Sequence, residues 1–240
     1  MTGSLQENYQ DIEVLELRNY LLKPGMTDTF SDYFNIHFVN PMRALGGHTI
    51  GQFKIAGAED RFLWMRGFSN MHIRSKFLVD FYVNSPVWKQ FGPGANEMMI
   101  NSDNVYLLRP LRTHENVKEQ RAKGNSYLLN AGKGITIVDF YTCNGTLNKV
   151  IHLFDTAYLP FLRSSGIQDI TLWVSEMAEN DFPRLPVFQD KNLLLTLTNY
   201  TGESDYELKK EKIISMPADL KNSMQELITI QSQIILLPIS

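Results

Sequence analysis

Hydrophobic and polar positions alternate in four short stretches of the first 110 residues, each rich in β-branched and aromatic residues. A period of two is typical of β-strands. We expect strands at residues 12–22, 48–55, 61–68 and 104–110. Apolar residues recur at helical spacing between the first two strands and between the last two. The first part of the chain therefore predicts the element order β-α-β-β-α-β.

The helices of this unit are indicated by aromatic spacing and by start and stop signals. Phenylalanines four positions apart predict a helix over residues 26–42. A second helix is expected to begin at Ser69, and a short one at Ser85-Pro86, since serine caps helices and proline suits the first turn. Gly92-Pro93-Gly94 is expected to end the short helix.

The same order of elements returns in the second part of the chain, where strands are expected at residues 134–143, 167–177, 192–200 and 230–238. Gly145 and Gly166 each follow an equivalent glycine, Gly25 and Gly46, by 120 residues. We infer an internal repeat, because the breakers and the strands recur together. The predicted organisation is one module at residues 10–111, a linker at 112–133 and a second module at 134–240.

Each repeat of this order folds as a ferredoxin-like module, a four-stranded antiparallel sheet with both helices on one face. The strands carry apolar residues on both faces; Phe62 and Trp64, for example, alternate with Leu63 and Met65. The face without helices therefore needs a second covering layer. Two modules packed sheet to sheet supply that layer, so the expected fold class is α+β, an α+β barrel formed within one chain.

Several motifs resemble those of a known family. Glu16-Leu17-Arg18-Asn19-Tyr20 with Lys23-Pro24-Gly25 is similar to the opening E-L-R-x-Y…x-x-G of the NIPSNAP proteins. Phe68 and Arg74, the segment SPVWKQF at residues 85–91 and the closing LLRP at 107–110 continue the resemblance over about the first 110 residues. The chain has Trp64-Met65-Arg66 where members often carry a His-Leu-Trp-like segment. This resemblance implies the dimeric α+β barrel superfamily, which includes cofactor-free oxygenases, isomerases, haem-binding enzymes and proteins without known chemistry.

Composition narrows the classes of partner. The chain has 23 basic and 26 acidic residues, a net charge of −3, so it has no general attraction for nucleic acid or anionic membranes. A single cysteine, Cys143, excludes an intrachain disulfide framework and a cysteine-clustered metal site. We find no apolar run of membrane-spanning length and no signal-peptide pattern, and therefore expect a cytoplasmic protein.

Polar residues in the first strand are the main candidates for a site. A period of two places Glu16, Arg18 and Tyr20 on one face and the leucines on the other. The leucines suit a helix layer, so we expect the polar set to point into the barrel. There it forms either a satisfied internal ion pair or the polar base of a ligand cavity. In a cavity, Arg18 is suited to bind a carboxylate or enolate, and Tyr20 to donate a hydrogen bond or a proton.

Other candidates follow from the same spacing. Trp64 and Arg66 share a strand face and, if it points inward, add an aromatic wall and a second cation. Asp139 and Tyr141 share a face in the second module, where Trp173 also lies in a strand. Aromatic residues at such positions are more often plain core than the wall of a ligand site.

The histidines contribute one further candidate. His48 begins a strand at the expected rim of the cavity and is the best candidate for proton transfer. No histidine pair has the spacing of metal ligands, so neither a metal nor another cofactor is expected.

These features lead to three functional hypotheses. The first is a protein that binds a small, largely apolar molecule with a polar or acidic group in the barrel, with cofactor-free oxygenase or isomerase chemistry at Tyr20, His48 and Arg66. The second is a non-catalytic scaffold whose barrel is filled by its own side chains. The third is a haem protein, since a single histidine can ligate haem. A homodimer of whole chains is compatible with all three.

Overall fold

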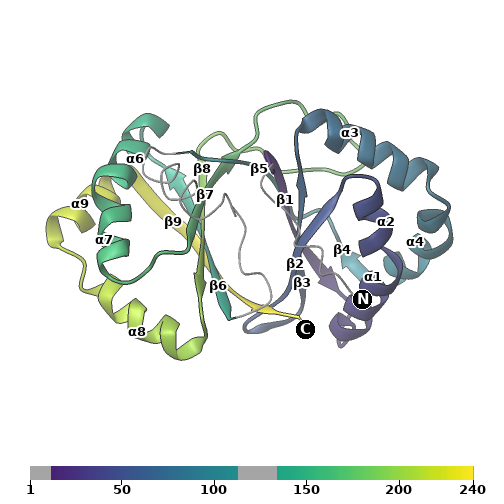
Figure 1. Cartoon of the computed structure of the whole chain (residues 1–240), viewed down its shortest axis with the longest axis horizontal. Helices are drawn as coiled ribbons and strands as arrows, with labels where there is room; N and C mark the ends of the chain where they lie inside the picture. Colours follow the sequence, from purple (N-terminus) through teal and green to yellow (C-terminus); the bar gives the residue numbers. More distant parts are fainter. Residues whose placement is uncertain (1–11, 113–133, 240) are drawn as a thin grey trace, which may run out of the picture.

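The computed structural model describes residues 12–112 and 134–239. Its strands surround a common axis, and the helices lie outside them on two opposite sides (Figure 1). The first half consists of β1 (Val14–Leu22), α1 (Thr27–His37), α2 (Val39–Ala44), β2 (His48–Ile55), β3 (Ala58–Phe68), α3 (Met71–Val79), the π-helical turn η2 (Asp80–Asn84), α4 (Pro86–Met98), β4 (Met99–Asn101) and β5 (Val105–Pro110).

The second half repeats this arrangement. It consists of β6 (Ile135–Cys143), α6 (Leu147–Leu153), the π-helical turn η3 (Phe154–Tyr158), α7 (Leu159–Ser164), β7 (Ile170–Ser175), β8 (Leu193–Tyr200), α8 (Glu203–Ile214), α9 (Ala218–Leu227) and β9 (Ile228–Pro238). The linker expected at 112–133 lies, apart from its first residue, outside the described residues.

Eight strands close into one barrel in the order β3-β2-β9-β6-β8-β7-β5-β1, with β1 pairing back to β3. Within the first half the order is β2-β3-β1-β5, and within the second it is β7-β8-β6-β9, which is the same order. The halves join through two antiparallel pairs, β2 with β9 and β5 with β7. The predicted α+β barrel of two ferredoxin-like sheets is therefore confirmed.

Most of the side chains that point into the barrel are apolar. Together they form one buried cluster with members from all eight strands and from none of the helices. Leu15, Leu17, Leu63, Met65, Phe140, Trp173 and Leu195 are among them. Two further clusters lie outside, each between one half of the barrel and its own helices. Each sheet is thus buried on both faces.

The first strand is oriented opposite to our expectation. Leu15 and Leu17 point into the barrel, whereas Val14 and Tyr20 pack against the helices. Glu16 and Arg18 lie on the same side as Tyr20. The leucines face the opposite sheet because that layer offers mainly apolar side chains. On the outside, α3 provides Arg74 as a partner for Glu16, and η2 provides Tyr82 as a partner for Arg66.

The start and end of the helices differ in part from the predicted signals. Ser85 caps α4 as expected, accepting a hydrogen bond from the backbone of Val87 at 3.1 Å. The cap of α3 is Asn70 rather than Ser69, because its side chain accepts from the Ile73 backbone at 2.8 Å.

Gly92-Pro93-Gly94 does not end α4, which continues to Met98. Packing against α1 explains this: the Tyr33 hydroxyl donates to the Phe91 carbonyl at 3.0 Å. A Cβ atom at Gly94 would lie 2.6 Å from the Tyr33 oxygen. This glycine therefore permits a close contact between two helices and is not a stop signal.

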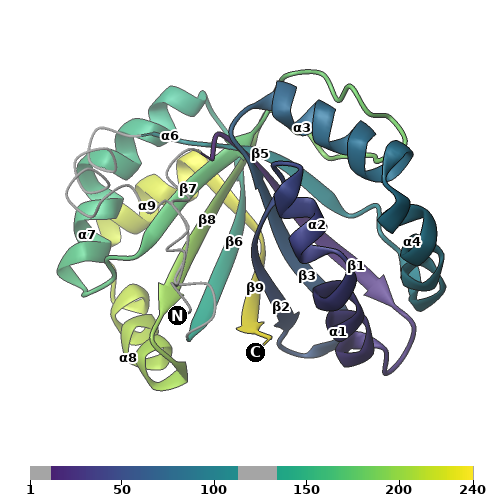
Figure 2. The same cartoon turned by 45° about the vertical axis from the view of Figure 1, so that its right-hand side comes forward.

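The connection between β7 and β8 crosses from the second half to the first. This segment, residues 176–192, passes over the outer side of the first half beside α3 (Figures 1 and 2). Phe188 bridges to Tyr106 of β5, and its backbone N–H donates to Val105 at 2.7 Å. Phe182 is buried in the first half's outer cluster. The second half thus provides part of the cover over the polar residues of β1.

Candidate functional site

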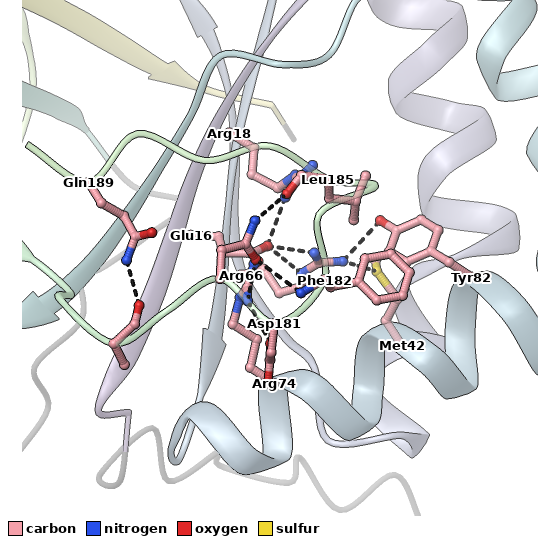
Figure 3. Close-up of polar contacts among 12 residues, drawn as sticks. Glu16, Arg18, Met42, Arg66, Arg74, Tyr82, Asp181, Phe182, Leu185 and Gln189 are labelled. Carbon is pink, nitrogen blue, oxygen red and sulfur yellow. Dashed lines mark hydrogen bonds and ion pairs between the residues drawn. The ribbon is translucent and has the colours of Figure 1, made fainter.

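Glu16 binds three arginines in the space between the first half of the barrel and its helices (Figure 3). Its Oε2 atom accepts from Arg18 Nη1 at 2.9 Å, Arg66 Nε at 3.0 Å and Arg66 Nη2 at 2.5 Å. Its Oε1 atom accepts from Arg74 Nε at 2.7 Å. All four side chains are at most 1% exposed. We call these four residues the arginine cluster.

Strand pairing and one helix bring the cluster together. Glu16 lies opposite Arg66 in the β1–β3 ladder, and Arg18 lies opposite Trp64. Arg74 reaches Glu16 from the first turn of α3, which begins after β3. The cluster thus needs only the β1–β3 register and the β3–α3 connection, both local features of the first half.

Further hydrogen bonds fix the arginines. Arg18 Nε donates to the Tyr20 hydroxyl at 2.9 Å, and Arg66 Nη1 donates to the Tyr82 hydroxyl at 3.1 Å. Arg74 Nη1 donates to Asn180 Oδ1 at 3.2 Å and lies 3.6 Å from a carboxylate oxygen of Asp181. Asn180 and Asp181 belong to the segment that crosses from the second half, so this crossing segment adds partners for Arg74.

The cluster carries excess positive charge in a buried place. Burial by itself would raise the pKa of Glu16, but Arg66, Arg18 and Arg74 outweigh it and hold that pKa well below its ordinary value of 4.5. Glu16 is therefore ionised, and it balances one of three guanidinium charges. Asp181, which is 45% exposed, is the only other carboxylate paired with these arginines in the described part of the chain. One positive charge is left over even when Asp181 is counted.

A cavity of about 280 Å³ adjoins this excess charge. Arg18 and Tyr20 line it from β1, Tyr82 and Trp88 from η2 and α4, and Arg184 from the crossing segment. A smaller space of about 30 Å³ shares four lining residues with it and includes Trp64. The cavity thus combines aromatic walls with two cations.

At this site, two buried hydrogen-bond donors have no partner within the described residues: Nη2 of Arg74 and Nε1 of Trp64. Buried donors are normally satisfied. Trp64 lines the smaller space, so an acceptor placed there by a ligand would satisfy its indole N–H. Burial also raises the pKa of Tyr20, which makes its hydroxyl a hydrogen-bond donor rather than a base.

The structure brings some of the site residues proposed from the sequence together and places the others elsewhere. Glu16, Arg18, Tyr20, Trp64 and Arg66 lie together, on the helix side rather than inside the barrel. Arg66 is held by Glu16 and Tyr82 and is not part of the described lining of the cavity.

The remaining candidates lie elsewhere. His48 is half-buried at the start of β2, opposite Gly67. Trp173 is in the barrel interior, where its indole donates to Thr171 at 2.9 Å. Asp139 and Tyr141 point to the helix side of the second half and line a different cavity, of about 650 Å³.

Sequence reasoning missed several residues that line or complete the first site. Tyr82, Trp88 and Arg184 come from η2, α4 and the crossing segment. Arg74 and Trp88 lie in the motifs that resemble the NIPSNAP family, which was a usable signal. No sequence signal indicated Arg184, because only the tertiary fold brings residues 176–192 onto the first half.

Neither cavity has a histidine in its described lining, so a haem held by a histidine does not fit them. Within residues 12–112 and 134–239, no three histidine, cysteine or carboxylate side chains are grouped as a metal site requires. Over the same ranges, no helix is long and apolar enough to cross a membrane.

Solved structures share this architecture over nearly the whole chain. A candidate monooxygenase from Fusobacterium nucleatum aligns with 95% of this chain and 93% of its own, at a TM-score of 0.57 and 8% identity. A candidate chlorite dismutase aligns over 95% of both chains, at a TM-score of 0.55 and 9% identity. At such low identities these likenesses show a common fold, the dimeric α+β barrel, and leave the activity open.

NIPSNAP proteins are also among the similar solved structures, over less than half of this chain. A NIPSNAP protein from Agrobacterium tumefaciens aligns with 43% of this chain and 93% of its own, at 18% identity and a TM-score of 0.39. No protein-family model and no curated protein matches the chain.

Proposed function

We propose that this α+β barrel protein binds a small, largely apolar molecule through an acidic group, in the cavity beside Arg18. The observation that carries this proposal is the excess of buried positive charge in the arginine cluster, next to a cavity whose described lining has two arginines and no carboxylate. A buried charge without a partner is costly, so a ligand anion would be bound in place of the missing carboxylate.

Geometry favours a carboxylate or an enolate as the acidic group. Arg18 uses Nε on Tyr20 and Nη1 on Glu16, which leaves Nη2 for the ligand. The Tyr20 hydroxyl accepts from Arg18, so its own proton is available to a second oxygen of the ligand. Tyr82, Trp88 and Phe182 would contact the apolar part. The cavity volume lies at the small end of ligand pockets.

The chemistry that fits this site is stabilisation of a negative charge. An enolate bound in the cavity would be stabilised by the charge of Arg18 and by a hydrogen bond from the Tyr20 hydroxyl. Cofactor-free oxygenase or isomerase chemistry would require this stabilisation from these residues. Arg66 would act as a positioning residue, because it holds Glu16 and thereby the orientation of Arg18.

Binding of matched acid and amide pairs tests the proposal. Benzoate with benzamide and phenylacetate with phenylacetamide are titrated while ligand NMR signals are followed. We expect each acid to bind about ten- to hundredfold more tightly than its amide, as a charge-assisted hydrogen bond would give. Arg18→Gln should remove this preference, and Arg184→Gln should reduce it without touching Glu16.

Arg109→Gln is the matched control, since Arg109 is an exposed arginine of β5. The Arg109→Gln variant should still bind each acid more tightly than its amide. Acids that bind no better than amides, or a preference that survives Arg18→Gln in a folded protein, would contradict the proposal. If Arg18→Gln does not fold, Arg184→Gln and the unmodified protein decide the question.

A further inference from the structure

The second half contains a larger cavity, of about 650 Å³, between its strands and the helices α8 and α9. It exists because these helices bury very little. Tyr206 is the one buried residue of α8, and α9 has none. In the first half, the helices at the same place in the repeat bury Arg74, Phe77, Leu78 and Phe81. The second half therefore leaves a larger cavity at this place than the first half does.

A carboxylate lies at the base of this cavity. Asp139 of β6 accepts hydrogen bonds from Gln233 Nε2 at 2.6 Å and from Thr196 Oγ1 at 3.1 Å. Both partners are neutral, and Asp139 forms no ion pair with a basic residue in the described part of the chain. Two lysines also line the cavity: Lys210, which is paired with Glu207 at 3.3 Å, and Lys221 of α9. Burial raises the pKa of Asp139, and the hydrogen bonds from Gln233 and Thr196 lower it only in part.

Four tyrosines surround this carboxylate. Tyr141 follows it on the same face of β6, and Tyr158, Tyr200 and Tyr206 line the cavity from η3, β8 and α8. The rings of Tyr200 and Tyr206 meet edge to face at 5.2 Å. Burial and the charge of Asp139 both raise the pKa of Tyr158 and of Tyr200, so these phenols stay neutral beside it.

Apolar residues make up much of the remaining wall. Ile137 and Ile228 contribute from the sheet, and Ile213, Met216 and Met224 from the helices and their connection. The lining is thus largely apolar and aromatic, with Asp139 as its one carboxylate and two lysines from α8 and α9. Aromatic faces attract cations electrostatically, and a carboxylate adds a direct partner for them.

We propose that this cavity is a second binding site, for an apolar molecule that carries a protonated amine, with the ammonium group bound by Asp139 among the four tyrosines. The site has a carboxylate in its lining where the one beside Arg18 has none, and the two cavities share no lining residue. The two halves of the repeat thus hold two sites that select ligands by opposite charges.

Matched amine and alcohol pairs test this second site. The probes are 2-phenylethylamine with 2-phenylethanol and tryptamine with tryptophol, titrated at neutral pH by the same NMR method. We expect each amine to bind about tenfold or more tightly than its alcohol. Asp139→Asn should abolish the difference while leaving the alcohol affinity nearly unchanged. Asp103→Asn, at an exposed aspartate of the first half, is the matched control and should have no effect.

A second variant tests the site in case Asp139→Asn does not fold. Gln233 is exposed, and Gln233→Lys would place an ammonium of the protein itself beside Asp139, which should block the amines. Arg18→Gln should leave amine binding intact. Amines that fail to bind, that bind no better than the alcohols, or that bind Asp139→Asn or Gln233→Lys as tightly as the unmodified protein would each overturn the proposal.

Discussion

Glu16 binds arginines from β1, β3 and α3, and it is the one carboxylate fully buried with them in the described chain. Such a group is costly to remove, because the arginines would lose their common partner without regaining water. The ion pair between Glu13 and Arg112 offers a contrast just before the same strand, since each of these side chains is 43% exposed. We therefore expect the contribution of each carboxylate to the free energy of unfolding to depend on its burial more than on its number of ion pairs.

We predict that Glu16→Gln lowers the free energy of unfolding by about 3–5 kcal/mol. Glu13→Gln should lower it by about 0–1 kcal/mol, as expected of an exposed pair. Urea denaturation at neutral pH measures both variants. Equal losses from the two substitutions would show that the arginine cluster does not depend on the Glu16 charge.

Comparison of the unmodified protein with Glu16→Gln predicts how stability depends on pH. The folded-state pKa of Glu16 lies well below its ordinary value of 4.5, so the stabilisation by its charge is complete above that pH. The contribution is lost as the pH falls below 4.5 toward the folded-state pKa. The stability difference between the unmodified protein and Glu16→Gln should therefore be constant near neutrality and shrink between about pH 5 and pH 3. A difference that stays constant to about pH 3 would contradict this.

At the scale of elements, α4 shows how packing overrides a local signal. Two glycines and a proline stand together in it, yet the helix runs on to Met98. Gly94 leaves room for Tyr33 of α1, whose hydroxyl binds the backbone of Phe91. The contact between α1 and α4 holds one wall of the cavity beside Arg18 in place, because Trp88 belongs to α4.

We predict that Gly94→Ala destabilises the protein, since overpacking costs about 1–3 kcal/mol and the better helix propensity of alanine returns about 1 kcal/mol at most. The cost should be smaller in a Tyr33→Phe background, because the oxygen nearest to the new Cβ is then gone. Thermal denaturation of the two single variants and the double variant measures this coupling. The idea fails if the cost of Gly94→Ala is the same in both backgrounds.

Strand positions were largely predictable, because both faces of each strand carry β-forming apolar residues and glycines separate the elements. The eight strands of the barrel fall within a few residues of their expected ranges. The short strand β4 and the length of α4 were missed, since β4 is defined only by pairing with the end of β1. Arg18 and Tyr20 were correctly grouped, whereas Tyr82 and Arg184 reach the site only through the fold.

At the scale of the whole molecule, the barrel interior belongs to both halves. Trp173 of β7 is fully buried there beside residues of β1 and β3. Two strand pairs and this shared apolar cluster join the halves, and residues 176–192 cross between them. Neither half buries its inner sheet face alone, so we expect one cooperative unit.

We predict that Trp173→Ala lowers the free energy of unfolding by about 3–5 kcal/mol, as large-to-small core substitutions do. Its effect should reach the first half: hydrogen exchange should accelerate in β1 as well as in β6. Ile36→Ala, at a residue of α1 that is 73% exposed, is the control and should change little. Protection of β1 that survives Trp173→Ala would mean that the halves unfold independently.

The sequence alone determined which residues share a face and in which order the elements come, because both follow from periods of two and of about four along the chain. It thereby grouped Glu16 with Arg18 and Asp139 with Tyr141. The tertiary structure decided which face of each strand points inward. Periodicity cannot distinguish two faces that are both buried, one under helices and one under the opposite sheet. Only the fold shows that Arg74, Tyr82 and the crossing segment supply partners on the helix side, and that the second half leaves its equivalent space open.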